Sequence, residues 1–307
     1  MATTETVRIF KLLARRVRRA HIRPYRTPKS KHVFTQHEHL TVLVFKTLTR
    51  ASTRTMEMLA PLVLGRSMDH STPGKAARRL GPALLHRLLV ACLPAVRGRI
   101  VALDSTGFST STRSPYYARR FFARAPCGFV KCSILIDTRT TAVLAAAIHI
   151  VPRHDIRDAR ILAPAAAGAR HLVADKAYDA EWLHRLLAEL GVQPHIPVRA
   201  GTRRGRWRRR HAKEFSMKIF HRRPLVETTH SVVKRRWGGT VAARNVVMIR
   251  IEILLKLVAH NLMLCVRNLT LCWMMSTQLS EKRIGCKPLS TVRGRTIFLN
   301  YDWGEDY

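Results

Sequence analysis

Acidic residues are scarce in this chain of 307 residues, which contains 19 Asp and Glu residues against 55 Lys and Arg residues. The formal net charge at pH 7 is therefore +36. A charge this positive favours a polyanionic partner, with nucleic acid as the first candidate and an anionic membrane surface as the second. Because 47% of the residues are hydrophobic, the chain can bury a substantial core, so the charge does not indicate disorder.

A secretory signal and an uninterrupted apolar segment of membrane-spanning length are also missing. The basic first 34 residues contain no apolar core of the kind that a signal peptide needs. The most apolar stretch, residues 246–275, is interrupted by charges such as Arg250, Glu252 and Lys256. These charges argue against a membrane span and favour a helix buried in a protein core.

Cysteine spacing gives no sign of a zinc finger. Four residues separate Cys127 from Cys132, and no second pair or histidine cluster follows at zinc-finger spacing. Cys265 and Cys272 lie about two helical turns apart in the apolar stretch, which suits one buried face. We therefore expect reduced thiols packed in the core of a cytosolic protein.

Charge and hydropathy patterns divide the chain into four segments. Residues 1–34 are expected to form a flexible basic arm, and residues 276–307 a C-terminal tail. Residues 35–97 have a helical pattern that begins with the capping box Thr35-Gln-His-Glu38. Exposed Arg and Lys residues suit a DNA-binding role for this helical region, but an ordinary helical subdomain would have the same pattern.

Residues 98–275 alternate between strand and helix patterns. Strands are predicted at residues 99–103, 130–136, 143–151, 171–174 and 192–198. Helices are predicted at residues 157–167 and 180–190. Three strands, a helix, a strand, a helix and a strand, followed by long helices, predict a mixed α/β domain.

Three of the few carboxylates stand where metal chemistry would need them. Asp104 and Asp175 each follow an apolar run predicted to be a strand, and Glu227 lies in the first turns of a predicted helix. Together they could hold two divalent ions about 4 Å apart, as two-metal phosphoryl transfer requires. The alternatives are structural: Asp104 could cap the turn or helix that follows it, Asp175 could be the N-cap of a helix over residues 178–190, and Glu227 could belong to a surface ion-pair ladder.

The blocks Asp104-Ser-Thr-Gly and Asp175-Lys-Ala-Tyr-Asp, followed by Glu227, resemble the Asp-Asp-Glu (DDE) transposases of bacterial and archaeal insertion sequences. The resemblance is most specific around Glu227, where that family has a Tyr-Arg-Glu-Lys signature with fixed spacing. The corresponding residues, with Phe in place of Tyr, are Phe220, Arg223, Glu227 and Lys234.

This resemblance implies a ribonuclease H-like fold: a mixed β-sheet flanked by helices and preceded by an all-α N-terminal region that binds DNA. It implies that Asp104, Asp175 and Glu227 are catalytic ligands of two Mg²⁺ ions, for which Mn²⁺ would substitute. The implied partners are double-stranded DNA, namely terminal inverted repeats and target DNA, and a second copy of the chain. The implied reaction is metal-dependent cleavage at element ends and transfer of the 3′-hydroxyl into target DNA, in the nucleoid of a prokaryotic cytoplasm and with no role for a membrane.

Basic and aromatic residues near the acids are expected to contact this DNA. Lys176 and Tyr178 belong to the second block by resemblance, although ordinary exposed turn residues would look the same. Arginines around Trp207 suit phosphate binding and base stacking, with a solvated loop as the alternative. The expected DNA-binding residues are Lys176, Tyr178, Arg203, Arg204, Arg206, Trp207, Arg208, Arg223 and Lys234.

Two other functions stay open on sequence alone. A metal-dependent nuclease or resolvase of the same fold would cut DNA without joining it. A catalytically inactive DNA-binding protein derived from a transposase would bind DNA without cutting it. A tyrosine or serine recombinase is disfavoured because neither Tyr178 nor Ser231 lies in a suitable Arg and His cluster.

Overall fold

The structure is a computed structural model that describes residues 2–25, 27, 33–94, 98–110, 128–151, 153–199, 201 and 204–281. The chain divides into two compact units, residues 1–267 and residues 268–307. Among the described residues, no helix is both long and apolar enough to cross a membrane. The elements below belong to the first unit, except that its last helix continues into the second.

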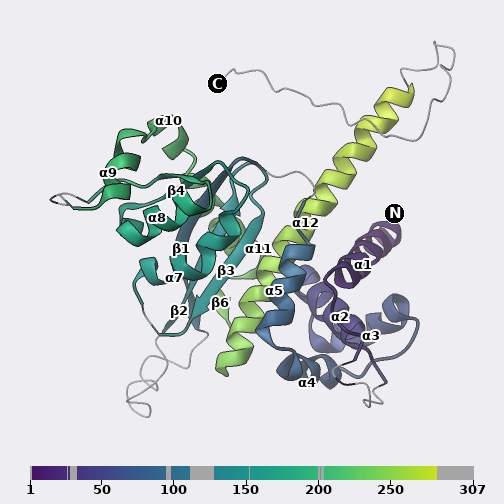
Figure 1. Cartoon of the computed structure of the whole chain (residues 1–307). Helices are drawn as coiled ribbons and strands as arrows, with labels where there is room; N and C mark the ends of the chain where they lie inside the picture. Colours follow the sequence, from purple (N-terminus) through teal and green to yellow (C-terminus); the bar gives the residue numbers. More distant parts are fainter. Residues whose placement is uncertain are drawn as a thin grey trace. The chain divides into compact units, whose positions relative to one another are not determined.

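Helices make up the N-terminal part of the first unit (Figure 1). They are α1 (Ala2–Arg19), α2 (Gln36–Thr49), α3 (Thr53–Leu64), α4 (Ser71–Arg79) and α5 (Pro82–Ala91). The expected capping box is present at α2, where Thr35 and Glu38 each bind the other's backbone N–H. The expectation of a flexible basic arm is wrong for residues 2–19, because Leu13 and Val17 of α1 are fully buried at i, i+4 spacing and hold the helix by packing.

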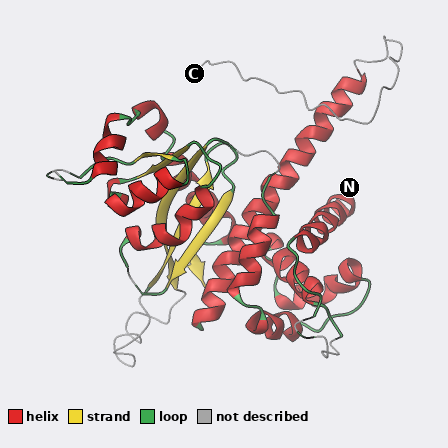
Figure 2. Cartoon of the chain, in the orientation of Figure 1, coloured by secondary structure: helices red, strands yellow, loops and turns green. Residues whose placement is uncertain are grey.

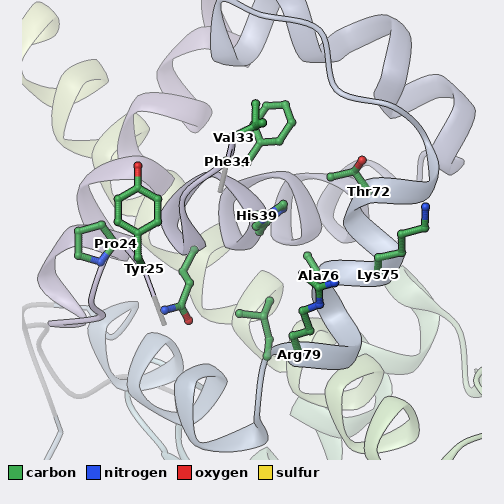
Figure 3. A pocket seen from close by; sticks show the side chains of 11 residues that line it. Pro24, Tyr25, Val33, Phe34, His39, Thr72, Lys75, Ala76 and Arg79 are labelled. Atoms are coloured by element: carbon green, nitrogen blue, oxygen red, sulfur yellow. The ribbon is translucent and has the colours of Figure 1, made fainter. Parts of the chain in front are cut away.

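A cavity of about 320 Å³ lies among these helices (Figure 3). Tyr25 and Phe34 line it together with Lys75 and Arg79, which both come from α4. Aromatic rings and cations suit a nucleic-acid surface, but they also occur on ordinary basic helical subdomains. Both interpretations of the helical region therefore stay open.

The strands of the described residues form a mixed sheet (Figure 2). They are β1 (Ile100–Thr110), β2 (Phe129–Asp137), β3 (Val143–His149), β4 (His171–Ala174), β5 (Gln193–His195) and β6 (Thr240–Val241). The order is β3-β2-β1-β4-β5, and β6 pairs with β1. The first three strands are antiparallel neighbours, whereas β4 and β6 run parallel to β1, and β5 runs parallel to β4.

Helices cover both faces of the sheet. They are α7 (Asp155–Leu162), α8 (Glu181–Glu189), α9 (Arg206–Lys213), α10 (Met217–Phe220), α11 (Pro224–Trp237) and α12 (Val246–Glu281), with 3₁₀ turns η1 (Ala163–Ala166) and η2 (Lys176–Tyr178). Side chains alternate along β1, so that Ala102 packs in a core with α11, α12 and the N-terminal helices, whereas Leu103 packs in a second core with α7 and α8. This mixed sheet flanked by helices confirms the predicted fold class.

The apolar stretch forms helix α12, which is mostly buried between Ile249 and Cys265 and continues past the expected boundary at residue 275. Its fully buried Asn261 joins two other elements, because the side-chain amide binds the backbone N–H and C=O of Val143 and also donates to Leu89 O. An amide with these three partners satisfies backbone groups at the edge strand β3 and at α5. The helix thereby fixes the N-terminal helical region against the sheet.

The described thiols agree with the expectation of reduced, packed cysteines. Cys92, Cys132 and Cys265 are free and buried. Burial raises the pKa of Cys92 and of Cys132 to about 12, so both are neutral thiols at physiological pH. Cys127 and Cys286 lie outside the described residues.

Candidate active site

Asp104 and Asp175 are brought together by the register of two parallel strands. Leu103 of β1 is paired with Ala174 of β4, so the next residue on each strand is one of the two acids. The expectation that Asp104 ends its strand is wrong, because β1 stays paired with β2 as far as Ser109. Asp104 instead lies within β1, at the point where the neighbouring strand β4 ends. Beyond this point β1 is no longer paired with β4, and the two acids lie at the edge so formed.

Each of the two aspartates also accepts a local backbone hydrogen bond. Asp104 Oδ1 accepts from Ser105 N at 2.8 Å, and Asp175 Oδ1 accepts from Ala177 N at 2.8 Å. The second bond caps the turn η2, as the structural alternative for Asp175 proposed, although that alternative placed the cap on the following helix. One oxygen of each carboxylate is thus oriented by the backbone, and the cap leaves a ligand role for the other oxygen.

Helix α11 brings Glu227 to the same edge. Its buried face consists of Val226, His230, Val233 and Trp237, which recur at helical spacing and pack against the sheet. Glu227 projects from the other side of the first turn, and its side chain is 54% exposed. A buried face directly beside an exposed acid is what allows this helix to be anchored and to offer a carboxylate to solvent.

Arg223 lies between two of the acids. Its Nη1 atom is 2.7 Å from Glu227 Oε1, and its Nη2 atom is 3.7 Å from Asp104 Oδ2. Burial raises the pKa of Asp104, the Ser105 N–H and Arg223 lower it, and the charges of Asp175 and Glu227 raise it. The three carboxylates therefore repel one another electrostatically, and one guanidinium offsets part of that repulsion.

The three carboxylates fit hard divalent cations by donor type, since all are oxygen ligands. Their oxygens are not gathered within 4.8 Å of one another; among the described residues, only Glu57, Asp69 and His70 form so close a group, and all three are exposed. The guanidinium of Arg223 between Asp104 and Glu227 accounts for the wider spacing. A metal bound by both acids would replace Arg223 at Asp104.

Two buried rings lie beneath the acids. Burial and the charge of Lys234 lower the pKa of His230 to about 4, so it is neutral at physiological pH. Tyr178 is fully buried, and burial raises its pKa, as do the charges of Asp155, Asp104 and other nearby acids. Because its ring is buried, Tyr178 cannot contact DNA in this structure. The expectation that Tyr178 binds DNA is therefore not supported.

The other expected DNA-binding residues fall into two groups. Lys176, Arg204 and Arg206 are exposed beside the acids or on the following loop and helix, as a DNA contact requires. Arg208 instead forms an ion pair with the buried Asp179 at 2.6 Å, and Lys234 Nζ donates to Thr106 Oγ1 at 2.7 Å. Both cations therefore make contacts within the protein that stabilise the fold. Arg203 lies outside the described residues.

The arginine-rich segment is itself fixed by an acid that the sequence analysis did not single out. Glu181 of α8 accepts hydrogen bonds from the backbone N–H groups of Trp207 and Arg208 and so caps α9. Trp207 is half-buried, with Arg206 and Arg210 each about 6 Å from its ring. Residues 206–213 thus form a capped helix, not the solvated loop of the alternative, and the helix displays Arg206, Arg209 and Arg210 to solvent.

Comparison with known proteins adds a family match. The family profile described as a transposase DDE domain matches residues 96–262, more than half of the chain. No curated protein matches the chain. Among solved structures, the cryo-EM structure of the piggyBac transposase synaptic complex with hairpin DNA is similar with 12% identity, a TM-score of 0.42, and coverage of 92% of this chain and 82% of that chain. A similarity this weak does not support a function for this chain.

Proposed function

This chain belongs to the transposase DDE domain family, and from that premise we propose that it cuts DNA at the ends of a mobile element and joins the released 3′-hydroxyl to target DNA. The observation that carries the proposal is the register Leu103 to Ala174, which sets Asp104 and Asp175 side by side. Glu227 completes the set from α11. Three acids at one edge of a strongly basic chain have the composition that phosphoryl transfer requires.

Asp104, Asp175 and Glu227 would hold two Mg²⁺ ions, with Mn²⁺ as a substitute. When bound, these ions supply activation of the attacking oxygen and stabilisation of the leaving oxygen. Arg223 would leave Asp104 and stay beside Glu227, where its charge can bind the scissile phosphate. Lys176 is exposed next to Asp175 and would contact the DNA backbone.

The reaction needs no covalent protein intermediate, because the oxygen of water and then the 3′-hydroxyl attack phosphorus directly. Two element ends must be held at once, so we propose a homodimer on double-stranded DNA. Burial of Tyr178 supports this route over recombination through a tyrosine nucleophile, since a buried phenol cannot reach DNA.

A cleavage and strand-transfer assay tests the proposal. The substrate is the DNA that flanks this gene's own ends, with Mg²⁺ or Mn²⁺, and the proteins are wild type, Asp104→Asn, Glu227→Gln and the control Glu57→Gln, which alters an exposed acid on α3. We expect cut and joined products with wild type and Glu57→Gln, and neither product with the other two. Cutting without joining would indicate a nuclease, and binding without cutting an inactive DNA-binding protein; either result would overturn the proposal.

A further inference from the structure

We propose that a charge cluster, formed by the buried Lys131 and Asp158 and the partly exposed Asp155, positions the Asp104 carboxylate through Ser105. This inference rests on the proposed function, since it concerns how the acid is presented to a metal ion. None of the three cluster residues is itself among the proposed ligands. The cluster lies on β2 and α7, whereas the acid that it positions lies on β1.

Among the described residues, Ser105 alone is hydrogen-bonded both to the cluster, through its hydroxyl, and to Asp104, through its backbone N–H. Its Oγ donates to Asp155 Oδ1 at 2.7 Å, and its backbone N–H donates to Asp104 Oδ1 at 2.8 Å. The first bond fixes the side-chain rotamer of Ser105 and ties to Asp155 a residue whose backbone is already paired with Ser133 of β2. The second transmits that position to one oxygen of Asp104.

Lys131 holds Asp155 in place from the other side. Its ammonium group lies 2.6 Å from the same Asp155 oxygen and 3.2 Å from Asp158 Oδ2, and it donates to Arg153 O at 2.7 Å. The lysine is only 7% exposed, so water screens its charge only weakly. Asp155 is therefore held at a single oxygen by an ammonium group and a hydroxyl.

Asp158 completes the charge balance of the cluster. It is fully buried, accepts a 2.6 Å hydrogen bond from Ser133 Oγ, and lies 3.0 Å from Arg153 Nε. His149 lies 3.1 Å away, and burial lowers the pKa of this histidine, which favours its neutral form. Two carboxylates thus face two strong cations, Lys131 and Arg153, and the cluster is electrically neutral.

A purely stabilising role does not account for this arrangement. Burying ions costs solvation free energy that their attraction often fails to recover, so an apolar cluster would stabilise the sheet as well. What an apolar cluster cannot do is hold a serine hydroxyl in one orientation beside a ligand. Hydrogen-bonded partners of metal ligands commonly change metal affinity about 10- to 100-fold when they are removed.

The strand pairing supplies a matched control. Ser105 and Ser133 stand directly opposite each other on β1 and β2, and each donates one hydroxyl to one acid of the cluster. Only Ser105 also contacts Asp104. Ser105→Ala and Ser133→Ala therefore remove the same chemical group from the same cluster. Ser105→Ala keeps the backbone N–H that binds Asp104 but releases that residue from Asp155, whereas Ser133→Ala leaves the residue beside Asp104 tied to the cluster.

The experiment measures Mn²⁺ binding by the full chain, from the electron paramagnetic resonance of free Mn²⁺, together with the denaturant midpoint of each protein. We expect Ser105→Ala to weaken Mn²⁺ binding about 10-fold and Ser133→Ala to change it less than about 2-fold, with similar losses of stability. Ser105→Thr keeps the hydroxyl and should bind Mn²⁺ as wild type does.

Two results would overturn the inference, and they can be told apart. If wild type binds Mn²⁺ no more tightly than Asp104→Asn, the acids are not a metal site and the proposed function fails with it. If wild type binds Mn²⁺ and both serine variants bind it equally well, the metal site stands but the cluster serves only the fold.

Discussion

Helices α9 and α11 both follow the second acid and both carry dense positive charge, but their cations do different things. At α11, Arg223 contacts Asp104 and Glu227, and Lys234 donates to Thr106 of β1. At α9, Arg208 holds the buried Asp179, whereas Arg206, Arg209 and Arg210 are exposed. Charge alone therefore does not identify the cations that bind DNA; the partner of each cation does.

The largest expected effect comes from Arg223, because it is the cation beside the acids. We expect Arg223→Gln to lower the rate of DNA cleavage by about 10³-fold, since a charge positioned beside the reacting phosphate contributes about 4 kcal/mol to transition-state stabilisation. Single-turnover cleavage at saturating protein measures this. The matched change at α9, Arg206→Gln, should lower that rate less than about 3-fold, and a comparable loss would remove the distinction between the helices.

Arg208 should matter for stability instead of catalysis. Arg208→Ala leaves the buried Asp179 without its cation, and breaking such a pair costs about 3 kcal/mol in free energy of unfolding. The exposed neighbour Arg209 is the control, for which Arg209→Ala should stay within about 0.5 kcal/mol. Urea denaturation measures both. Equal stability of the two variants would mean that the backbone N–H of Arg199 and the ring of His184, which also contact Asp179, suffice to hold it.

Much of this architecture could be predicted from the sequence. Apolar runs before Asp104 and Asp175 indicated two strands that bring these acids together, although β1 continues past Asp104, and the signature spacing indicated that Arg223 and Glu227 belong together. The charge of residues 1–34, by contrast, masked the i, i+4 pair Leu13 and Val17 that makes α1 a packed helix.

The cluster beneath the acids could not be predicted in the same way. It depends on which residues of β1 and β2 stand opposite each other, and on how α7 packs over them, and neither is a local property of the chain. A lysine inside the apolar run of β2 was the one local indication. Burial of Tyr178 is likewise a tertiary property, since the polar turn around it, which includes the exposed Lys176, gives no local apolar pattern.

As the pH falls, we expect the contacts of His195, which lie on the same side of the sheet edge as α9, to be lost before the charge pairs at α11. His195 Nε2 lies 3.1 Å from His171 Nδ1, and His195 Nδ1 accepts from Ser216 N, which connects β5 to the start of α10. Burial lowers the pKa of His195 to about 4, against about 6.5 in an unfolded chain. Between these values the unfolded chain binds the proton and the folded chain does not, so stability falls as pH drops from about 6.5 to 4.

Urea midpoints across this pH range measure the loss, which we expect to reach about 2 kcal/mol for this group. Carboxylates with ordinary pKa values of about 4 titrate at the lower end of this window, so a variant that lacks only the His195 titration is needed for comparison. His195→Asn keeps an acceptor for Ser216 N–H and removes the titration, and its stability should depend less steeply on pH. An unchanged slope in this variant would assign the acid sensitivity to other histidines, such as the buried His184 and His211.

The smallest effect should come from the exposed cations of α9, and it should appear in salt dependence more than in rate. A side chain that neutralises one phosphate contributes about 0.9 to the slope of log affinity against log salt concentration. Arg206→Gln and Arg210→Gln should each reduce this slope by about 1 for double-stranded DNA of any sequence, measured by fluorescence anisotropy between 50 and 200 mM salt. Arg208→Lys should leave it unchanged, because residue 208 faces Asp179 and not solvent. A reduced slope for Arg208→Lys would mean that DNA draws this cation out of the fold, and the partner of a cation in the free protein would no longer predict its role on DNA.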